Sequence, residues 1–241
     1  MNHIFLTGTL TRAELRHTAQ DQTPLCEFDL EFQFERREAA VRETVTVTAW
    51  NELGIDVYNR FPVGSQVLIE GLTQIEQVPL AENRTNPRLS IRALRIQSAS
   101  LGQSLNTVML IGYVGGDPDR KDQDSGNVVV NVSLAINRPK TEEPDWYSLE
   151  LWNKTAEVAA TYIRKGSLIG VAGSLKIDRW TDKATQFLRT KSVIRVDRLE
   201  LLGSKRETGS GETEVASDIE PETSEVAAPN RKRKTAKASA A

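Results

Sequence analysis

Three of the four tryptophans lie in one stretch of the second half of the chain, at Trp146, Trp152 and Trp180. Cations accompany them along the same stretch, at Lys154, Lys165, Lys176 and Arg179. An unpaired base presents a flat face that stacks on an indole ring at about 1–3 kcal/mol per base, and each nucleotide carries a phosphate that a cation neutralises. Aromatic rings interleaved with positive charge therefore indicate a surface that binds a single nucleic-acid strand.

Each of these residues also has an ordinary structural explanation. A tryptophan on a strand is usually half-buried core, and a lone lysine or arginine is usually solvated surface. Three tryptophans beside cations in one stretch favour binding over packing. Trp50, the fourth tryptophan, is as consistent with core packing as with binding, and we keep it among the candidate binding residues.

No other pattern in the chain points to an enzyme, a metal site or a cofactor. The run Gly112-Tyr-Val-Gly-Gly lacks the lysine and the spacing of a phosphate-binding loop. The two histidines, His3 and His17, have no nearby cysteine, and the single cysteine, Cys26, fits a buried strand thiol. Four aspartates that precede Gly126 lack the spacing of a calcium loop and fit a polar hairpin turn. We therefore predict a non-enzymatic protein that needs no cofactor.

The stretch that holds the tryptophans alternates like a strand and then continues as a helix. Between residues 145 and 152, aromatic and polar side chains share one face and apolar side chains share the other. The first set is Trp146, Ser148, Glu150 and Trp152, and the second is Tyr147, Leu149 and Leu151. A helix is predicted over residues 154–164, with Asn153 or Thr155 as its cap, Gly166 at its end and Tyr162 in the core.

The flanking segments complete a small barrel. Residues 108–112 and 128–137 are predicted strands before this stretch, and residues 167–177 and 191–202 are predicted strands after the helix. Three strands, one helix and two strands are the layout of the OB-fold, a five-stranded Greek-key barrel that binds oligonucleotides. The first half follows the same path, with strands over residues 4–10, 25–34, 43–50, 65–77 and 89–97 and a weaker helix over residues 51–61.

The two halves of the chain repeat each other. The matches keep their order and include Asn2 with Asn106, Gly8 with Gly112, Trp50 with Trp152, Gly64 with Gly166, and Gly71 with Gly173. We therefore predict an all-β protein of two tandem OB-fold five-stranded Greek-key barrels, each with one short helix. The first copy spans residues 1–103 and the second spans residues 104–204.

A tail over residues 205–241 follows the two copies. It contains seven acids and no base between Glu207 and Glu225, and a basic run, Arg-Lys-Arg-Lys, at residues 231–234. With so few apolar residues to bury, this tail is predicted to be disordered. We consider two roles for its basic end, contact with nucleic acid and simple solubilisation; deletion of residues 228–241 would leave the affinity and its salt dependence unchanged in the second case.

The second copy resembles bacterial single-stranded DNA-binding proteins (SSB). The resemblance rests on W-x₅-W, then NKTAEVAATYIRKGS, then G-S-L-x₃-R-W-T-D, and it is colinear from about Leu105 to Ser204. With the first copy included it covers most of residues 1–204. The tail differs, because the family usually ends in an acidic tip that finishes Ile-Pro-Phe and recruits replication and repair enzymes.

The resemblance implies a function and a set of site residues. Trp146, Trp152 and Trp180 match the family's aromatic stacking positions, and Lys154, Lys165, Lys176 and Arg179 match positions where the family commonly has phosphate-contacting cations. A further aromatic position of the family is Lys140 here. The family coats single-stranded DNA in replication, repair and recombination, and commonly assembles four OB-folds. Two per chain imply a homodimer, with a tetramer of chains as the alternative.

The first copy keeps fewer of these positions. Trp50 remains, whereas the equivalents of Trp146 and Trp180 are Thr44 and Val78. Losing two stacking platforms would weaken this copy by several kcal/mol, at about 1–3 kcal/mol per base. Phe34 and the arginines of this half, which include Arg36, Arg37, Arg42, Arg84, Arg88 and Arg92, are candidates to compensate in part. We predict a strong second site and a weak or mainly architectural first copy.

Charge and hydropathy agree with a cytoplasmic, nucleoid-associated protein. No apolar run approaches the roughly 18 residues of a membrane span, and the first residues lack the pattern of a signal peptide. The net charge is −2, and neither copy is strongly basic. Affinity would therefore rest on stacking and local basic rows, which suits a single strand better than a duplex.

Three rival interpretations are weighed beside single-stranded DNA binding. Single-stranded RNA is one, because OB-folds bind both nucleic acids. A primosome-like adaptor or assembly scaffold is another, favoured for the first copy by its missing aromatic residues. A nuclease ranks last, because it would need clustered carboxylates for a metal and none recur in both copies.

Overall fold

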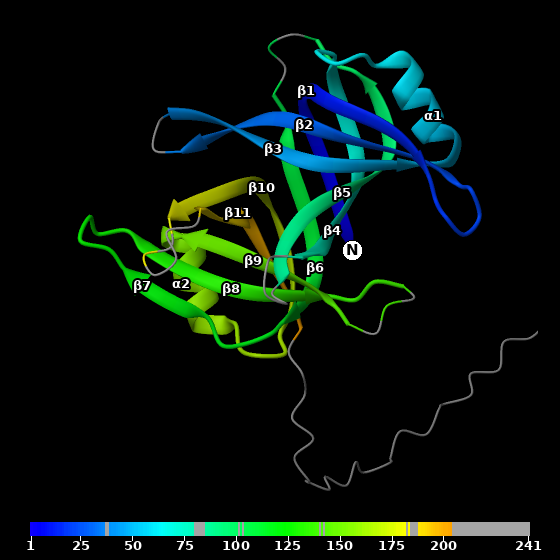
Figure 1. Ribbon diagram of the computed structural model, residues 1–241. Helices are drawn as coiled ribbons and strands as arrows, with labels where there is room; N and C mark the ends of the chain where they lie inside the picture. Colours follow the sequence, from blue (N-terminus) through cyan, green and yellow to red (C-terminus); the bar gives the residue numbers. More distant parts are fainter. Residues whose placement is uncertain are drawn as a thin grey trace, which may run out of the picture. The chain divides into compact units, whose positions relative to one another are not determined.

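Alternating apolar side chains build two β-barrels, one from each half of the chain (Figure 1). The structure is a computed structural model that describes residues 1–36, 39–79, 85–100, 102, 104–139, 141, 143–181, 183 and 188–203. The inward-facing side chains are buried, as for Phe28 and Leu30 in the first barrel and Leu149 and Leu151 in the second. This burial has the period of two that a strand imposes, because successive side chains point to opposite faces.

The first barrel has five strands and one helix: β1 (Asn2–His17), β2 (Pro24–Arg36), β3 (Ala39–Trp50), α1 (Asn51–Arg60), β4 (Gln66–Pro79) and β5 (Thr85–Ser98). The strands are hydrogen-bonded in the order β2-β3-β5-β4-β1. The outer half of β1 also pairs with β2, from Thr9 to His17, and this pairing closes the barrel. The predicted order of strands and helix is confirmed for this copy.

The second barrel repeats the plan with one additional strand. Its elements are β6 (Asn106–Val114), β7 (Asp119–Asp122), β8 (Val128–Ile136), β9 (Asp145–Trp152), α2 (Asn153–Tyr162), β10 (Leu168–Thr181) and β11 (Leu188–Gly203). The order is β6-β10-β11-β9-β8, and pairing of β6 with β8 closes it. The aspartate-rich segment forms β7 and the hairpin that leads into β8, in which Gly126 donates to the carbonyl of Gln123 at 2.9 Å. The polar hairpin is confirmed.

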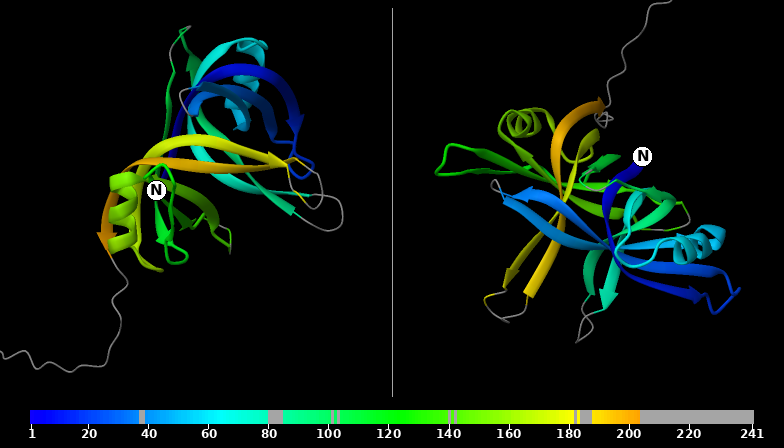
Figure 2. Two further views of the ribbon diagram at one scale, coloured as in Figure 1. Left: turned by 90° about the vertical axis from the view of Figure 1, so that its left-hand side faces the viewer. Right: turned by 90° about the horizontal axis from the view of Figure 1, so that it is seen from above.

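The two barrels share one continuous sheet. β1 and β6 pair antiparallel, from Asn2 opposite Leu110 to Leu6 opposite Asn106, and so join the strand orders of both copies (Figure 2). Residues 1–206 form one compact unit.

The predicted division at residue 103, between β5 and β6, stays a prediction. The predicted tail and Lys140, Arg37 and Arg84 lie outside the described residues.

The helices differ from the prediction at their ends. Asn153 is the first residue of α2, with a positive φ of 50°, and its Oδ1 accepts a hydrogen bond from the Val128 amide rather than capping the helix. The helix ends at Tyr162, so Gly166 lies in the following turn. Tyr162 is 65% exposed, and the prediction that it belongs to the core is wrong. Neither α1 nor α2, the helices of the described residues, is long and apolar enough to cross a membrane.

Cys26 lies on β2 and is fully buried. Burial raises the pKa of its thiol, which disfavours the nucleophilic thiolate. The prediction of a buried strand thiol is confirmed.

A buried tyrosine of the second copy is hydrogen-bonded to the first. The Tyr147 hydroxyl donates to the carbonyl of Thr73 at 3.0 Å and accepts from Asn2 Nδ2 at 3.2 Å. Asn2 also accepts from the Thr73 amide at 2.9 Å, so β1, β4 and β9 meet at one polar cluster inside the protein. Burial raises the pKa of Tyr147, which therefore stays protonated and able to donate. This cluster adds side-chain contacts to the backbone pairing that joins the barrels.

Asp145 gives the stability of the protein a pH dependence. Its carboxylate is buried, and Arg138 Nε lies 3.2 Å from its Oδ2, close enough for an ion pair but not aligned as a hydrogen bond. Burial raises the pKa of Asp145 above its ordinary value, and Arg138 opposes this shift. Because the folded state holds this proton more tightly than the unfolded chain, its contribution to stability is lost as the pH rises through the raised pKa.

We expect Asp145→Asn to gain stability relative to the wild type as the pH rises from about 4 to about 7, because asparagine cannot ionise. Urea unfolding at both pH values measures the difference. Asp119→Asn is the matched control, because Asp119 is exposed on β7. A difference between Asp145→Asn and wild type that does not change with pH would contradict this account.

Candidate nucleic-acid interface

The outer surface of β9 carries the predicted aromatic and polar row. Tyr147, Leu149 and Leu151 are buried, whereas Trp146 is 51% exposed. Trp146 lies opposite Ala135 of β8, so the row continues onto a neighbouring strand of small side chains. The predicted division of this strand into two faces is confirmed.

The Trp146 indole lies against the backbone of Gly115. A Cβ atom at position 115 would be 2.2 Å from Cζ3 of the indole, which is closer than real Cβ atoms approach. The Gly115 amide donates to the carbonyl of Ser133 at 2.8 Å and holds this segment against β8. The absent side chain of Gly115 therefore provides the space that the ring occupies. The sequence did not indicate this contact, because it depends on tertiary structure.

We expect Gly115→Ala to displace the Trp146 ring and to weaken the binding of a single strand by up to the value of one stacked base, about 1–3 kcal/mol. Fluorescence anisotropy with a labelled oligo-dT measures the Kd. Gly116→Ala is the matched control, because a Cβ at position 116 meets no atom within 4 Å. Equal Kd values for the two variants would show that Gly115 does not position the ring.

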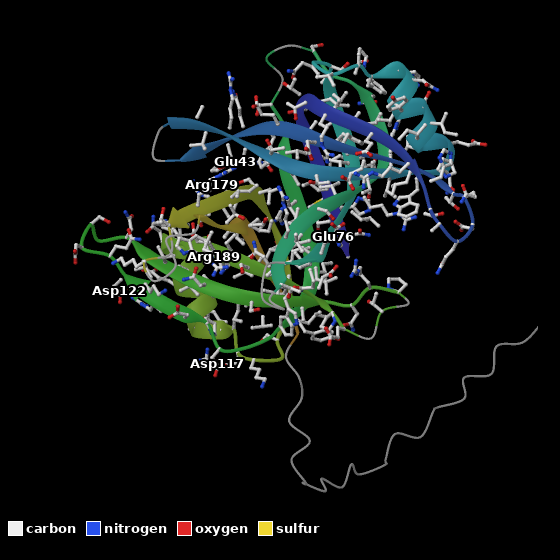
Figure 3. The ribbon with its side chains drawn as sticks, viewed as in Figure 1. Glu43, Glu76, Asp117, Asp122, Arg179 and Arg189 are labelled. Carbon is white, nitrogen blue, oxygen red and sulfur yellow. The ribbon has the colours of Figure 1, made fainter. Side chains whose placement is uncertain are left out.

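The end of the β10–β11 hairpin presents the second exposed indole. Trp180 is 47% exposed and pairs in register with Arg189 of β11. Arg179, its neighbour, forms two hydrogen bonds with Glu43 of β3, one of them from Nε to Oε1 at 2.7 Å (Figure 3). These hydrogen bonds raise the pKa of Arg179 further above its ordinary value. The charge predicted to contact phosphate is therefore matched by a carboxylate of the first copy.

Glu150 joins two other predicted residues. Its carboxylate accepts from Trp152 Nε1 at 2.7 Å and from Lys176 Nζ at 2.8 Å to each oxygen. Asp178 lies 3.3 Å from the same ammonium group. The Lys176 side chain is only 16% exposed, so its charge is largely satisfied within the protein. Glu150 thus fixes the orientation of the Trp152 indole and reduces what Lys176 offers to a phosphate.

Lys154 and Lys165 present their side chains to solvent beside α2. Lys154 is in the first turn, and Lys165 follows the end of the helix, where its amide donates to Asp117 Oδ1 at 3.0 Å. Lys176 and Arg179 are instead paired with carboxylates, although Arg179 is exposed as well. The arrangement favours stacking on Trp146 and Trp180, with phosphate contacts in a secondary role.

The first copy lacks a comparable aromatic surface in the described residues. Trp50 is half-buried, and the positions of Trp146 and Trp180 are occupied by Thr44 and Val78, which are also half-buried. Phe34 is only 8% exposed, so the structure does not support its predicted compensating role. The prediction of a weak or architectural first copy is consistent with this placement, and it stays a prediction.

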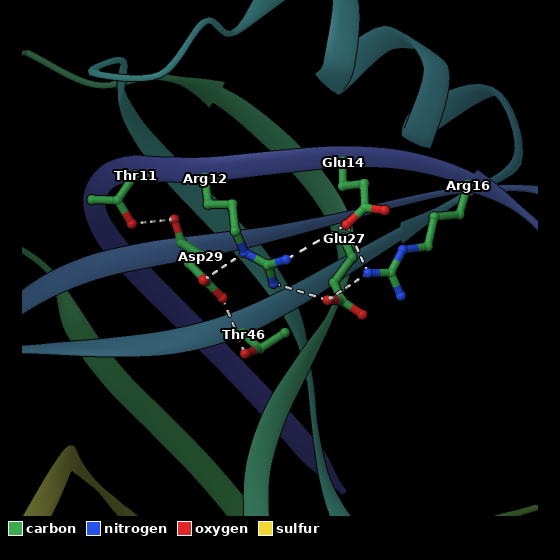
Figure 4. A network of polar contacts seen from close by, with 7 residues as sticks. All are labelled: Thr11, Arg12, Glu14, Arg16, Glu27, Asp29 and Thr46. Atoms are coloured by element: carbon green, nitrogen blue, oxygen red, sulfur yellow. Dashed lines mark hydrogen bonds and ion pairs between the residues drawn. The ribbon is translucent and has the colours of Figure 1, made fainter.

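Charged side chains form a network on the equivalent face of the first barrel (Figure 4). Arg12 of β1 donates to Asp29 and to Glu27 of β2, both at 2.9 Å, and Thr46 of β3 donates to Asp29 at 3.2 Å. In the repeat, Glu27 and Asp29 of β2 occupy positions where β8 of the second copy has small polar residues. The arginines of this network are matched by carboxylates, so the face offers little unpaired positive charge to a phosphate backbone.

Two relatives are about as long as one copy of the repeat. A protein named single-stranded DNA-binding protein 1 from Nostoc sp. (strain PCC 7120) is 56% identical over 114 residues, which cover 47% of this chain and 96% of the relative. A single-stranded DNA-binding protein from Thermosynechococcus vestitus is 52% identical over 105 residues, which cover 43% of this chain and 88% of the relative.

A solved structure matches both barrels together. The crystal structure of the wild-type single-stranded DNA-binding protein from Thermus aquaticus superimposes with a TM-score of 0.69, covering 87% of this chain and 97% of that chain at 24% identity. At that identity the likeness concerns the fold. The model of the single-strand binding protein family matches residues 1–99 and again residues 105–202. With most of its length matched in two successive copies, the chain belongs to the single-strand binding protein family, whose members bind and do not catalyse.

Proposed function

We propose that this protein binds single-stranded DNA without sequence specificity through the outer surface of the second barrel. The bases stack on Trp146 and Trp180, with Trp152 beside them, and phosphates contact Lys154 and Lys165. Stacking accepts every base, which explains the absence of sequence preference. Such a protein coats and protects exposed strands during replication, repair and recombination on the nucleoid, where proteins of those processes are its further partners.

The exposure of two indole rings carries this proposal. Trp146 and Trp180 are 51% and 47% exposed, although tryptophan gains more than most side chains from burial. Gly115 makes room for one ring, and the other lies at the end of a paired hairpin. Rings that are held in place yet left in water are available to a planar ligand.

The charge distribution predicts how binding responds to salt. For a single strand, each neutralised phosphate contributes about −0.7 to the slope of log K against log salt concentration. Because only Lys154 and Lys165 are offered to phosphates in this proposal, the slope of log K against log salt concentration should be shallow for the second barrel. Affinity that persists in high salt would distinguish this stacking-dominated mode from binding driven by phosphates.

Titration of a labelled oligo-dT, followed by anisotropy and by quenching of tryptophan fluorescence, tests the function. We expect tight binding with strong quenching, and much weaker binding of a DNA hairpin of the same length. An RNA oligomer of matched length serves as the competitor. Preference for the duplex, or no binding of either strand, would contradict the proposal. Preference for RNA would replace DNA as the ligand.

The outer face of the shared sheet supports assembly into a homodimer with four barrels. Ile111, Tyr113 and Leu202 lie on β6 and β11, and Ile111 and Leu202 meet above Gly170 of β10. Tyr113 and Leu202 are 55% and 49% exposed in the single chain. Apolar groups exposed over neighbouring strands typically mark an interface. Light scattering should give about twice the 26.8 kDa of one chain; a mass of one or four chains would overturn the dimer.

A further inference from the structure

One ion pair links the candidate binding hairpin of the second barrel to the first barrel. Arg179 of β10 and Glu43 of β3 point toward one another in Figure 3 and form two hydrogen bonds, from Nε and from Nη2. Such a two-point contact between a guanidinium and a carboxylate fixes direction as well as distance. The Arg179–Glu43 pair therefore restrains the part of β10 that immediately precedes Trp180.

Glu43 is a buried residue of the first barrel. Its exposed fraction is 6%, and it alternates with Thr44 along β3, on the same face as the buried Val45. Phe32, which pairs with Glu43 across β2 and β3, is also buried, and its ring lies 6.0 Å from that of Phe34. β2 and β10 are also in contact. The β2–β3 hairpin thus reaches the second barrel, with Glu43 as a buried polar residue of that contact.

The pair also determines which way the neighbouring indole faces. Arg179 and Trp180 are consecutive residues of a strand, so their side chains leave opposite faces. Because Arg179 is directed toward Glu43 and the first barrel, Trp180 is directed away from that barrel and into solvent. A free Arg179 would let this end of the hairpin turn or move away from β3.

The repeat places a second buried carboxylate at the equivalent position. The residue of the second copy that corresponds to Glu43 is Asp145, which is also a buried carboxylate at the start of its strand. Its strand, β9, contacts β4 of the first copy, where the Tyr147 hydroxyl donates to the carbonyl of Thr73. In each copy, the third strand of the barrel therefore carries a buried carboxylate at this position and contacts the fourth strand of the other copy.

We propose that Glu43 is a positioning residue for the nucleic-acid surface of the second barrel, and that Arg179 serves this contact rather than a phosphate. The proposal rests on the proposed single-strand binding. It assigns the first copy a specific task, which is to hold the Trp180 hairpin of the second copy in its binding orientation.

The rival role of Arg179, a direct phosphate contact, makes opposite predictions. If Arg179 met a phosphate, removing Glu43 would release the cation and strengthen binding, and removing Arg179 would reduce the salt slope by about 0.7. If Arg179 is part of a positioning contact, both removals weaken binding and neither changes the slope.

The first experiment is a double-mutant cycle on oligo-dT binding with the full chain. We expect Glu43→Ala and Arg179→Ala each to raise the Kd roughly fivefold to tenfold, at the lower end of the loss of one stacked base, and the double variant to be no worse than either alone. Salt slopes should equal that of the wild type. Glu31→Gln is the matched control, because it removes one carboxylate from the opposite face of the same hairpin. Tighter binding by Glu43→Ala, or a lower slope for Arg179→Ala, would overturn the proposal.

A charge swap separates the two roles again. Glu43→Arg or Arg179→Glu alone should weaken binding, and the two together should restore it, because the pair is rebuilt in reverse. If Arg179 touches DNA, the double swap would stay weak, since it leaves an acid at the phosphate.

Thermal unfolding of the same four proteins without DNA tests the Glu43–Arg179 contact independently of the ligand. We expect the two alanine variants to lower the Tm and their effects not to add. If the wild type fails to bind oligo-dT while this coupling is present, the proposed function falls and the contact between barrels stands. Additive Tm effects would show that Glu43 does not act through Arg179.

Discussion

Removing both exposed indoles, with Trp146→Ala and Trp180→Ala in one chain, is expected to weaken oligo-dT binding by about 2–6 kcal/mol. The value is the sum of two stacked bases at 1–3 kcal/mol each, and it corresponds to a Kd raised roughly 30-fold to 10⁴-fold. Both rings are about half exposed in the free protein, so their removal opens no core cavity. The loss should therefore appear in binding and not in stability.

Anisotropy of a labelled oligo-dT is the suitable measurement, because the double variant loses half of the tryptophans that report by fluorescence. Tyr162→Ala is the matched control, since Tyr162 is an exposed aromatic residue on α2, away from the row on β9. Its Kd should equal that of the wild type. Unchanged affinity of the double variant would move the binding site away from these rings, to the first barrel or the tail.

The barrels themselves could be predicted because their determinants are local and occur twice. The alternation of Tyr147, Leu149 and Leu151 with Trp146 and Glu150 requires only the period of a strand. Where the strand pattern of the first copy was weak, the equivalent segment of the second copy showed the same strand more clearly. Every predicted strand is present, the short strand β7 was not predicted, and several strands are longer than predicted because paired hairpins extend past the barrel core.

The helix ends were less predictable because backbone geometry overrode local propensity. Asn153 is a favoured cap, but it adopts a positive φ at the sharp turn from β9 into α2 and its side chain reaches back to β8. Asn51 also adopts a positive φ, after β3, so this turn recurs in both copies. Tyr162 fits a helical apolar position, yet small residues, Ala156 and Ala159, form the buried side of α2.

The candidate site could be predicted by residue type and not by charge balance. The exposed rings and the exposed lysines were identified from the stretch that contains them. The carboxylates that pair with Lys176 and Arg179 were not. Glu150 lies on another strand, 26 residues from Lys176, and Glu43 lies in the other copy, 136 residues from Arg179. A basic residue in a motif has a phosphate-binding role only if no acid reaches it first, and that depends on how the two barrels meet.

Gly112→Ala is expected to be among the most destabilising substitutions of a small residue in this chain, at roughly 3 kcal/mol, the upper end for overpacking. A Cβ at position 112 would lie 2.4 Å from the carbonyl oxygen of Ala135 and 2.9 Å from the Ile136 side chain. Gly112 is where β6 passes from pairing with β10 to pairing with β8, so the clash falls on the closure of the barrel. Gly8, its repeat equivalent, has a 2.4 Å approach to Glu31 for the same reason.

Chemical denaturation with urea measures this loss, and Gly116→Ala is the matched control within the same barrel. A Cβ at position 116 would meet no atom within 4 Å, so its stability should change little. Gly112→Ala should also weaken strand binding under conditions where it stays folded, because Ala135, whose carbonyl must move, lies opposite Trp146. Stability equal to that of the control would mean that β6 and β8 separate without cost, and that the closed barrel is not what holds the Trp146 surface in place.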